Sequence, residues 1–293
     1  MNRYEQQLAS YATQVNDALR ERLHFDRELR QIVVVDAMRY SLLDAGKRLR
    51  AAMVLEFGRL TRASREGAMA LACSIEMIHA YSLIHDDLPC MDDDDFRRGK
   101  PSCHKAFGEA NALLAGDGLL TLAFETAADA PLTDSQRVEA VRTLSKAAGV
   151  RGMLGGQVID LSCEGKPVDL ETLNTLYALK TGALLRASAR LGCLTGNADE
   201  EFYGAADRYA QACGLAFQIT DDILDVTGDA KKLGKPVGSD EENHKTTYVT
   251  LLGLSGARER ARELAEGAKE QVAKIPDNEF LLWVADMILG RDH

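Results

Sequence analysis

The sequence predicts an all-α protein, and two observations lead to this prediction. Apolar residues recur at every third and fourth position through long segments of the chain, which is the spacing of one face of a helix. The alternating pattern of β-strands is nearly missing, and proline, which interrupts helices, occurs only six times in 293 residues. We therefore expect helices packed around a central space.

Helices are expected, in chain order, at residues 1–24, 28–45, 47–61, 65–88, 104–128, 133–150, 169–196, 200–227, 241–253, 255–273 and 279–290. The segment 169–196 illustrates the reasoning. Asp169 can cap its first turn, an apolar stripe follows, and Gly196 can end the helix. The breaks between the segments are too short to act as domain linkers, so we predict one domain over residues 1–293.

Composition and charge limit the partners and the location. The formal net charge of -10 argues against nucleic acid or a membrane surface as the main partner. The first residues show no signal peptide, and the most apolar window, residues 112–124, is too short to span a bilayer, so we expect a cytoplasmic protein. The six cysteines lack Cys-x-x-Cys spacing, so we expect no zinc site.

An acidic cluster follows the apolar helix predicted at residues 65–88. It contains Asp86 and Asp87, then Pro89, then the run Asp92–Asp95. A solvated acidic loop is one interpretation. However, carboxylates at a helix C-terminus meet the negative end of the helix dipole, and they also repel one another. A bound cation would relieve both effects, so we favour a metal site.

A second acidic cluster lies within the helix predicted at residues 200–227. Helical spacing places Asp221 and Asp225 on one face, which Asp222 and Gln218 extend, while the remaining side chains are apolar. Burying unpaired carboxylates costs on the order of several kcal/mol each, so this face should border a polar cavity with a counter-charge. Oxygen-only ligands favour hard cations: Mg2+, with Ca2+ as the alternative, although EF-hand spacing is missing.

Several cationic side chains lie within or next to apolar helices, and for Lys47 and Arg50 a solvated basic first turn is the alternative to a binding site. Lys47 and Arg50 share one face at the start of a predicted helix, where anions bind favourably. Lys180 lies on the apolar stripe of segment 169–196, and His79 lies inside an apolar helix, where a satisfied core histidine is the alternative. Further cations follow the two acidic clusters: Arg97, Arg98, Lys235 and Lys245. Carboxylates for metal together with cations for phosphate predict a polyanionic substrate.

Three motifs resemble the hallmark regions of the trans-isoprenyl diphosphate synthases. They are Gly46–Arg50 (GKRLR), Ser82–Asp92 (SLIHDDLPCMD) and Phe217–Asp225 (FQITDDILD), and the resemblance runs from about Tyr40 to the end of the chain. Within that family the chain is most similar to the bacterial-type farnesyl diphosphate synthases. The resemblance implies a bundle of mostly antiparallel helices around a deep cavity, usually as a homodimer. Ala45, Ala51 and Thr220 depart from the usual family pattern, but none of these changes removes a charged ligand.

The resemblance also implies roles for individual residues. Up to three Mg2+ ions are expected at Asp86, Asp87, Asp92, Asp221, Asp222 and Asp225. Isopentenyl diphosphate is expected at Lys47, Arg50, His79 and Arg98. The allylic substrate, dimethylallyl or geranyl diphosphate, is expected at Arg97, Lys180, Thr181, Gln218, Lys235 and Lys245. Of these, Lys180, Thr181 and Gln218 are also expected to border the reacting carbocation.

The length of the product is predicted from the residues just before Asp86. Ser82 and Tyr81 lie four and five residues upstream, about one helical turn away, along the expected path of the allylic tail. Small Ser82 leaves room and bulky Tyr81 can close the cavity, although Tyr81 as an ordinary core aromatic is the alternative. An aromatic residue at this position resembles a farnesyl-length stop, so we expect a fifteen-carbon product.

Other interpretations remain at this stage. A geranyl or geranylgeranyl diphosphate synthase would differ only in product length. A terpene cyclase needs one diphosphate site, and the second set of cations argues against it. A non-catalytic subunit of a heteromeric synthase would be favoured by loss of an aspartate motif, and both motifs are intact.

Overall fold

The structure is a computed structural model that describes residues 1–43, 46–228 and 245–291. Its elements are α1 (Arg3–Arg22), α2 (Ile32–Leu42), α3 (Leu49–Leu60), α4 (Arg65–Asp86), β1 (Phe96–Arg97), β2 (Lys100–Pro101), α5 (Cys103–Phe107), α6 (Glu109–Ala128), α7 (Asp134–Ala148), α8 (Met153–Cys163), α9 (Leu170–Tyr177), η1 (Ala178–Gly182), α10 (Ala183–Leu194), α11 (Glu200–Thr227), α14 (Tyr248–Val272) and α15 (Glu279–Leu289). The predicted all-α class is confirmed, since the described strands are one short antiparallel pair.

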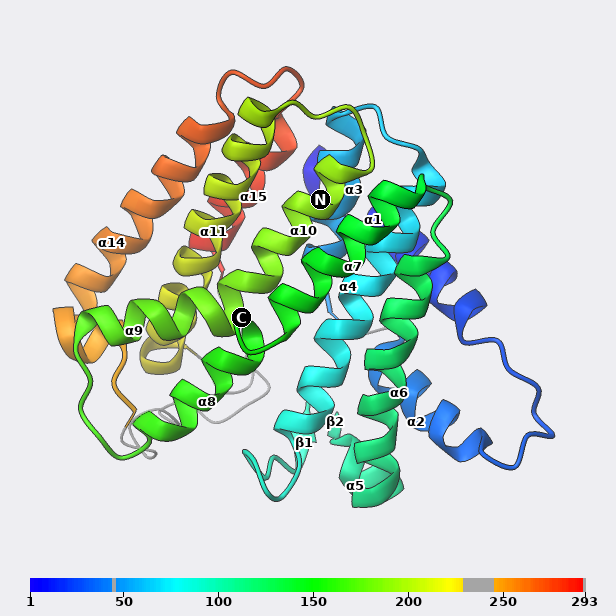
Figure 1. Ribbon diagram of the computed structural model, residues 1–293. Helices are drawn as coiled ribbons and strands as arrows, with labels where there is room; N and C mark the ends of the chain where they lie inside the picture. The colour runs from blue at the N-terminus through cyan, green and yellow to red at the C-terminus, as the bar shows by residue number, and fades with distance from the viewer. Residues whose placement is uncertain (44–45, 229–244, 292–293) are drawn as a thin grey trace.

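The helices pack as a bundle in which helices distant in sequence lie side by side (Figure 1). α4 packs along α3 and α6, α10 packs against α3 and α11, and α14 packs along α11 and α15. The β1–β2 hairpin lies just beyond the end of α4 (Figure 1). This arrangement lets α4 and α11, which carry the two acidic clusters, end in the same part of the molecule.

α4 is the central helix of the larger apolar core. Fourteen of its 22 residues are buried, including Ile75, Ile78 and Ile84. Of the described helices, α4 alone is long and apolar enough to cross a membrane, judged by length and composition. However, 78% of its most apolar window is buried inside the protein. Because α4 is buried on most of its surface, its apolar composition is that of a core helix.

Two predicted helices have different bounds in the structure. The segment predicted at 104–128 is divided into α5 and α6, because Gly108 has a φ of 81° that a continuing helix does not tolerate. The helix predicted at 28–45 begins only at Ile32. Asp169 does cap its helix as predicted, since its side chain accepts from the Thr172 N–H at 2.8 Å.

α8 was not predicted, because Gly155 and Gly156 lower the helix propensity of its first turns. The helices predicted at 241–253 and 255–273 form one element, α14, within the described residues. Its backbone turns at Gly253, where φ is 70°, so the break falls close to where it was expected. Residues 241–244 lie outside the described part of the chain.

The helix predicted at 169–196 is interrupted by a turn of π-helix. Residues 178–182 form η1 between α9 and α10, and this turn contains Lys180. A π-turn inserts one extra residue into the helical repeat and changes the direction of the side chains it carries. Apolar periodicity cannot reveal such a turn, yet π-turns are frequent at functional sites.

Candidate active site

The first acidic wall is formed at the C-terminus of α4, where Asp86 is the last helical residue. Its carboxylate borders a cavity, and burial raises its pKa to about 6 despite the opposing charge of Lys180. The loop that follows folds back, because the Asp92 N–H donates to the Asp86 carbonyl at 2.8 Å. Asp92 itself is exposed. Asp86 is thus a partly buried carboxylate that a cation would stabilise.

Asp87 points elsewhere, toward an arginine. Arg97 Nε donates to both carboxylate oxygens of Asp87, at 3.0 and 3.3 Å, and Arg97 also contacts Asp94 at 3.2 Å. Burial opposes the charge of Arg97, but the hydrogen bond that it donates to Asp87 and the charges of Asp87 and Asp94 together outweigh burial and raise the arginine pKa. Asp87, Arg97 and Arg98 line a separate pocket of about 100 Å³. The structure therefore does not bring Asp87 to the cavity that Asp86 borders.

The second acidic wall is the last part of α11. Asp222 is buried and accepts hydrogen bonds from the Tyr177 hydroxyl at 2.8 and 2.9 Å and from the Tyr248 N–H at 2.9 Å. Asp221 forms an ion pair with Arg291 at 2.7 Å. Asp225 is also buried. The polar surroundings that the buried face of this helix requires are therefore supplied partly by tyrosines and by the C-terminal arginine.

One cavity of about 310 Å³ brings together residues of all the predicted groups. Its lining includes Arg50, His79, Tyr81, Ser82, Asp86, Lys180 and Thr181. These residues come from α3, α4, η1 and the adjoining helices, so they are close only in the folded chain. Tyr81 is nearly buried and packs edge-to-face on His85, with ring centroids 5.7 Å apart.

One cation of this cavity, Arg50, has a donor that no protein group satisfies among the described residues. Arg50 Nε is buried and has no hydrogen-bond partner among the described residues, and burial lowers the pKa of this guanidinium. Burial and the neighbouring Arg50 and Arg98 charges lower the pKa of His79 well below its usual value. His79 is therefore neutral near pH 7 and can donate one N–H. An anion would satisfy Arg50 and relieve the repulsion between the cations.

Lys180 lies where this cavity meets a second one. Its Nζ forms an ion pair with Asp160 of α8 at 2.5 Å, and Asp160, like Asp86, offsets the effect of burial, so the lysine pKa is raised. The second cavity, of about 230 Å³, is lined by Lys180, Gln218, Asp222 and Lys245 among others. The predicted allylic residues Thr181 and Gln218 contact each other directly, at 2.8 Å.

The remaining predicted residues lie at the edges of the site. Lys47 is exposed on the turn before α3. Arg98 lies against the same turn, since a Cβ placed on Gly46 would be 3.2 Å from Arg98 Nη2. Lys235 lies outside the described residues. The assignment of all these residues to substrates stays a prediction.

Several charged residues at the site were not predicted from the sequence. Asp160 holds Lys180, Arg291 holds Asp221, and Glu76 holds Arg48 at 3.1 Å. Asp160 is the one charged residue in the apolar segment Met153–Cys163, and this isolated charge could have drawn attention to it. The other two pairs join residues too far apart in sequence for any local pattern to reveal them.

The donor atoms of the two acidic walls fit Mg2+. This ion takes one or two carboxylates and completes its octahedral shell with water and substrate phosphate. Asp86 lines the cavity of about 310 Å³ and Asp222 lines the cavity of about 230 Å³, so both walls offer carboxylate oxygens to a cavity. Within the described residues, the acid and histidine side chains close enough to share one ion form a different group, Asp93, Asp95 and His104, whose ligand atoms lie within 4.8 Å of one another.

The fold and the site together define the class of protein. Carboxylates on two helices border cavities lined by cations, inside an all-α bundle, which is the arrangement of a diphosphate-using prenyl transferase. The family follows from direct comparison. The model of the Polyprenyl synthetase family matches residues 31–279, and the chain belongs to this family. The resemblance to trans-isoprenyl diphosphate synthases is thereby confirmed.

Individual relatives agree with this assignment. The farnesyl diphosphate synthase of Escherichia coli (strain K12) is 45% identical over 297 residues, covering 99% of each chain. The chloroplastic geranylgeranyl pyrophosphate synthase of Capsicum annuum is 47% identical over 266 residues, covering 89% of this chain and 72% of that protein.

Solved structures share the fold over nearly the whole chain. The FPP/GFPP synthase of Zymomonas mobilis has a TM-score of 0.88 at 36% identity and covers 98% of each chain. A geranyltransferase of Helicobacter pylori, complexed with magnesium and isoprenyl diphosphate, has a TM-score of 0.82 at 31% identity and covers 99% of this chain and 97% of that one.

Proposed function

We propose that this protein is a farnesyl diphosphate synthase, which condenses isopentenyl diphosphate with dimethylallyl diphosphate and then with geranyl diphosphate. The observation that carries the proposal is the single cavity that joins Arg50 and His79 to Asp86 and Lys180, with Tyr81 in its lining. Two diphosphate sites facing one cavity suit a reaction between two diphosphate esters. Several bacterial relatives named farnesyl diphosphate synthase, 41–46% identical, support the fifteen-carbon product.

The allylic diphosphate binds between the two acidic walls, beside Lys180, Thr181 and Gln218. Mg2+ bound by Asp86, Asp92 and Asp221 would neutralise the diphosphate and make it a better leaving group. The magnesium complex of the Helicobacter pylori relative supports this choice of ion. Lys180 sits between the two cavities, where its charge attracts the departing diphosphate.

Isopentenyl diphosphate binds at the turn before α3 and at His79. Arg50 supplies a guanidinium whose Nε lacks a protein partner, and neutral His79 supplies one N–H donor. With the substrate fixed there, its double bond attacks the allylic carbon as the C–O bond of the allylic ester breaks. This attack forms the new C–C bond. The cationic adduct then loses one proton, which the released diphosphate accepts, and the electrons of the broken C–H bond form the double bond of the product. Positioning and exclusion of water are the tasks of the protein.

The proposal also covers the oligomeric state of the protein and its location in the cell. α6 leaves Leu113 and Leu114 about half exposed, at 47% and 51%, and apolar side chains exposed together favour contact with another copy of the chain. We propose a homodimer in the cytoplasm. Analytical ultracentrifugation at several protein concentrations tests the dimer, and a monomer at all of them contradicts it.

The decisive experiment identifies the products. The enzyme is incubated with labelled isopentenyl diphosphate, dimethylallyl diphosphate and Mg2+, and the dephosphorylated alcohols are separated by chromatography. We expect farnesol, with geraniol at early times. A twenty-carbon alcohol would instead identify a geranylgeranyl diphosphate synthase, and accumulation of geraniol alone would identify a geranyl diphosphate synthase. No condensation at all would favour a non-catalytic subunit, and cyclic hydrocarbons would favour a cyclase.

A further inference from the structure

Glu76 is a buried carboxylate that lies beside the proposed isopentenyl diphosphate site without lining its cavity. It lies on α4, is only 3% exposed, and accepts hydrogen bonds from the turn before α3 and from the first turn of α3. Its Oε2 accepts from Arg48 Nη1 at 3.1 Å, and its Oε1 accepts from the Ala51 N–H at 3.0 Å. Ala51 belongs to the first turn of α3, where backbone N–H groups lack helical partners. Glu76 thus caps α3 from another helix.

Arg48, the partner of Glu76, has an unusual backbone. Its φ is 54°, in the left-handed region that residues other than glycine rarely adopt, and its side chain is almost fully buried. The same guanidinium donates to Asn16 Oδ1 of α1 at 2.8 and 3.0 Å and to the Leu42 carbonyl at the end of α2. Such a conformation persists only where surrounding contacts hold it, and here Glu76 supplies the opposite charge.

The turn fixed in this way carries the predicted diphosphate ligands. Lys47 and Arg50 flank Arg48, and His79 follows Glu76 by three residues on the same face of α4. A single carboxylate therefore connects the turn that bears two ligands to the helix that bears the third. Glu76 also opposes the lowering of the Arg50 pKa by burial, so it supports the charge of the guanidinium that would meet the substrate.

We propose that Glu76 is a positioning residue for isopentenyl diphosphate: through Arg48 and the Ala51 N–H, it holds the Gly46–Arg50 turn so that Lys47 and Arg50 stand beside His79. This inference rests on the proposed function for the identity of the ligand. It goes further in assigning a role to a residue that touches neither substrate nor metal. The competing possibility is that the Arg48–Glu76 pair only stabilises the fold.

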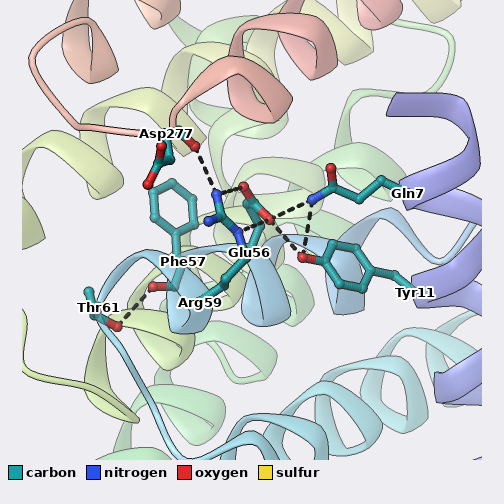
Figure 2. Close-up of polar contacts among 7 residues, drawn as sticks. All are labelled: Gln7, Tyr11, Glu56, Phe57, Arg59, Thr61 and Asp277. Atoms are coloured by element: carbon teal, nitrogen blue, oxygen red, sulfur yellow. Dashed lines mark hydrogen bonds and ion pairs between the residues drawn. The ribbon is translucent and has the colours of Figure 1, made fainter. Parts of the chain in front are cut away.

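A second buried carboxylate in the same region provides a matched control. Glu56, on α3, is 0% exposed and accepts hydrogen bonds from Tyr11 at 2.7 Å and Gln7 at 3.0 Å, as Figure 2 shows. It also pairs with Arg59 at 2.8 Å, and Arg59 in turn donates to the Asp277 carbonyl (Figure 2). Glu56 thus has the burial and the arginine partner of Glu76, but its contacts lead to α1 and to the α14–α15 turn.

The test compares Glu76→Gln with Glu56→Gln. The glutamine at position 76 keeps an oxygen for the Ala51 N–H but no longer pairs with the charge of Arg48. We expect its KM for isopentenyl diphosphate to rise about tenfold or more, with the KM for geranyl diphosphate changed less than about twofold. Calorimetry with isopentenyl diphosphate alone should show the same loss of affinity. Glu56→Gln should lower the melting temperature at least as much and leave both KM values unchanged.

A double variant separates positioning from stability if Glu76→Gln does not fold. Replacing a buried ion pair by apolar side chains of similar size often preserves stability, so Arg48→Met with Glu76→Met should fold. We expect it to keep a near-normal melting temperature and still bind isopentenyl diphosphate about tenfold more weakly. Wild-type affinity in the double variant, or equal changes in both KM values, overturns the proposal. Arg50→Gln tests the site itself: if it leaves isopentenyl diphosphate affinity unchanged, the proposed site is at fault rather than the role of Glu76.

Discussion

Asp86 carries its charge in surroundings that solvate it poorly, and this has a consequence for stability. Burial raises its pKa from 3.8 to about 6 in the metal-free protein. In the unfolded chain the group ionises near 3.8, so between these two values the folded protein binds a proton that the unfolded chain has released. The free energy of unfolding is therefore highest at low pH with respect to this group. It falls by up to roughly 3 kcal/mol as the pH rises through 6.

Asp86→Asn should consequently stabilise the metal-free protein at about pH 7.5 and have little effect near pH 4, where the wild-type carboxyl is already protonated. Turnover at pH 7.5 should fall steeply because a metal ligand is lost. Thermal melts in chelator at both pH values, alongside an activity assay, check this. A lower melting temperature at neutral pH would mean that Asp86 is held by structural contacts and is not a strained carboxylate.

Tyr81 is expected to limit product length because it lines the cavity about one turn before Asp86. Tyr81→Ala should shift the products toward twenty carbons or more, with a stability loss of roughly 3 kcal/mol from the cavity created. Tyr81→Phe keeps the ring and should still give farnesyl diphosphate. Chromatography of the dephosphorylated products decides. If Tyr81→Ala is active and still stops at fifteen carbons, another residue closes the cavity.

Arg291 occupies the position next to Asp221 that a cation would take. It pairs with Asp221 at 2.7 Å, and its guanidinium lies over the Phe217 ring, 4.0 Å from the centroid. Mg2+ must displace this contact to reach the same oxygen. Arg291→Gln should therefore bind Mg2+ about three- to tenfold more tightly, since the pair is partly exposed and of moderate strength.

Magnesium titrations followed by calorimetry or by melting temperature measure this effect of Arg291. Arg260→Gln is the control, because Arg260 pairs with Glu263 on the exposed face of α14, at 2.9 Å. Its Mg2+ affinity should equal that of the wild type. Unchanged or weaker Mg2+ binding by Arg291→Gln would show that the arginine does not compete with the ion.

At the scale of elements, α8 and η1 approach each other closely beside the site. A Cβ on Gly156 would lie 2.3 Å from the Lys180 backbone nitrogen and 2.6 Å from its Cα, so no side-chain rotation could relieve the clash. Gly156→Ala must separate the two elements and lengthen the Asp160–Lys180 pair. We expect a loss of roughly 2 kcal/mol in the free energy of unfolding and weaker binding of geranyl diphosphate.

Gly267→Ala on α14 is the control for this substitution. A Cβ at Gly267 meets no heavy atom within 4 Å, so alanine there should be neutral or should stabilise the helix by up to about 1 kcal/mol. Urea denaturation and the KM for geranyl diphosphate are measured for both variants. Equal stabilities would indicate that α8 shifts freely and that the close packing has no role.

The elements also show what sequence patterns can and cannot predict. Long helices rich in apolar residues, such as α4 and α11, were predicted nearly to their ends because burial of apolar side chains dominates their stability. α8 was missed because Gly156 serves close packing against η1, which depends on a partner elsewhere in the chain. The π-turn at Lys180 was missed for the same reason.

At the scale of the whole molecule, the sequence predicted the class of site but not its internal pairing. The motifs predicted which aspartates and cations form the site, since charged residues inside apolar helices need an explanation in any fold. The partners of those residues could not be predicted: Arg97 for Asp87, Tyr177 for Asp222 and Arg291 for Asp221. Each pairing joins residues from different elements, so it depends on the packing of the bundle.

The metal-free protein holds like charges close together in both walls, so a ligand that bridges them should change the whole molecule. Chelation should abolish turnover and added Mg2+ should restore it. Mg2+ with inorganic diphosphate should raise the melting temperature, because a ligand at about a hundred times its dissociation constant adds roughly 2.7 kcal/mol to the stability of the folded state. Full activity in chelator would contradict the metal assignment.

Hydrogen exchange can show whether that ligand bridges the walls. Residues 83–98 contain the end of α4 and the β1 strand, which belong to the first acidic wall. Residues 215–227 contain the end of α11, which forms the second acidic wall and is distant in sequence. A bridging complex must slow exchange in both segments over the same range of Mg2+ concentration, because neither wall binds the diphosphate without the other. Mg2+ alone, without diphosphate, should protect them less. Protection of only one segment would mean that the walls bind ions independently, and the two-wall site would then be wrong.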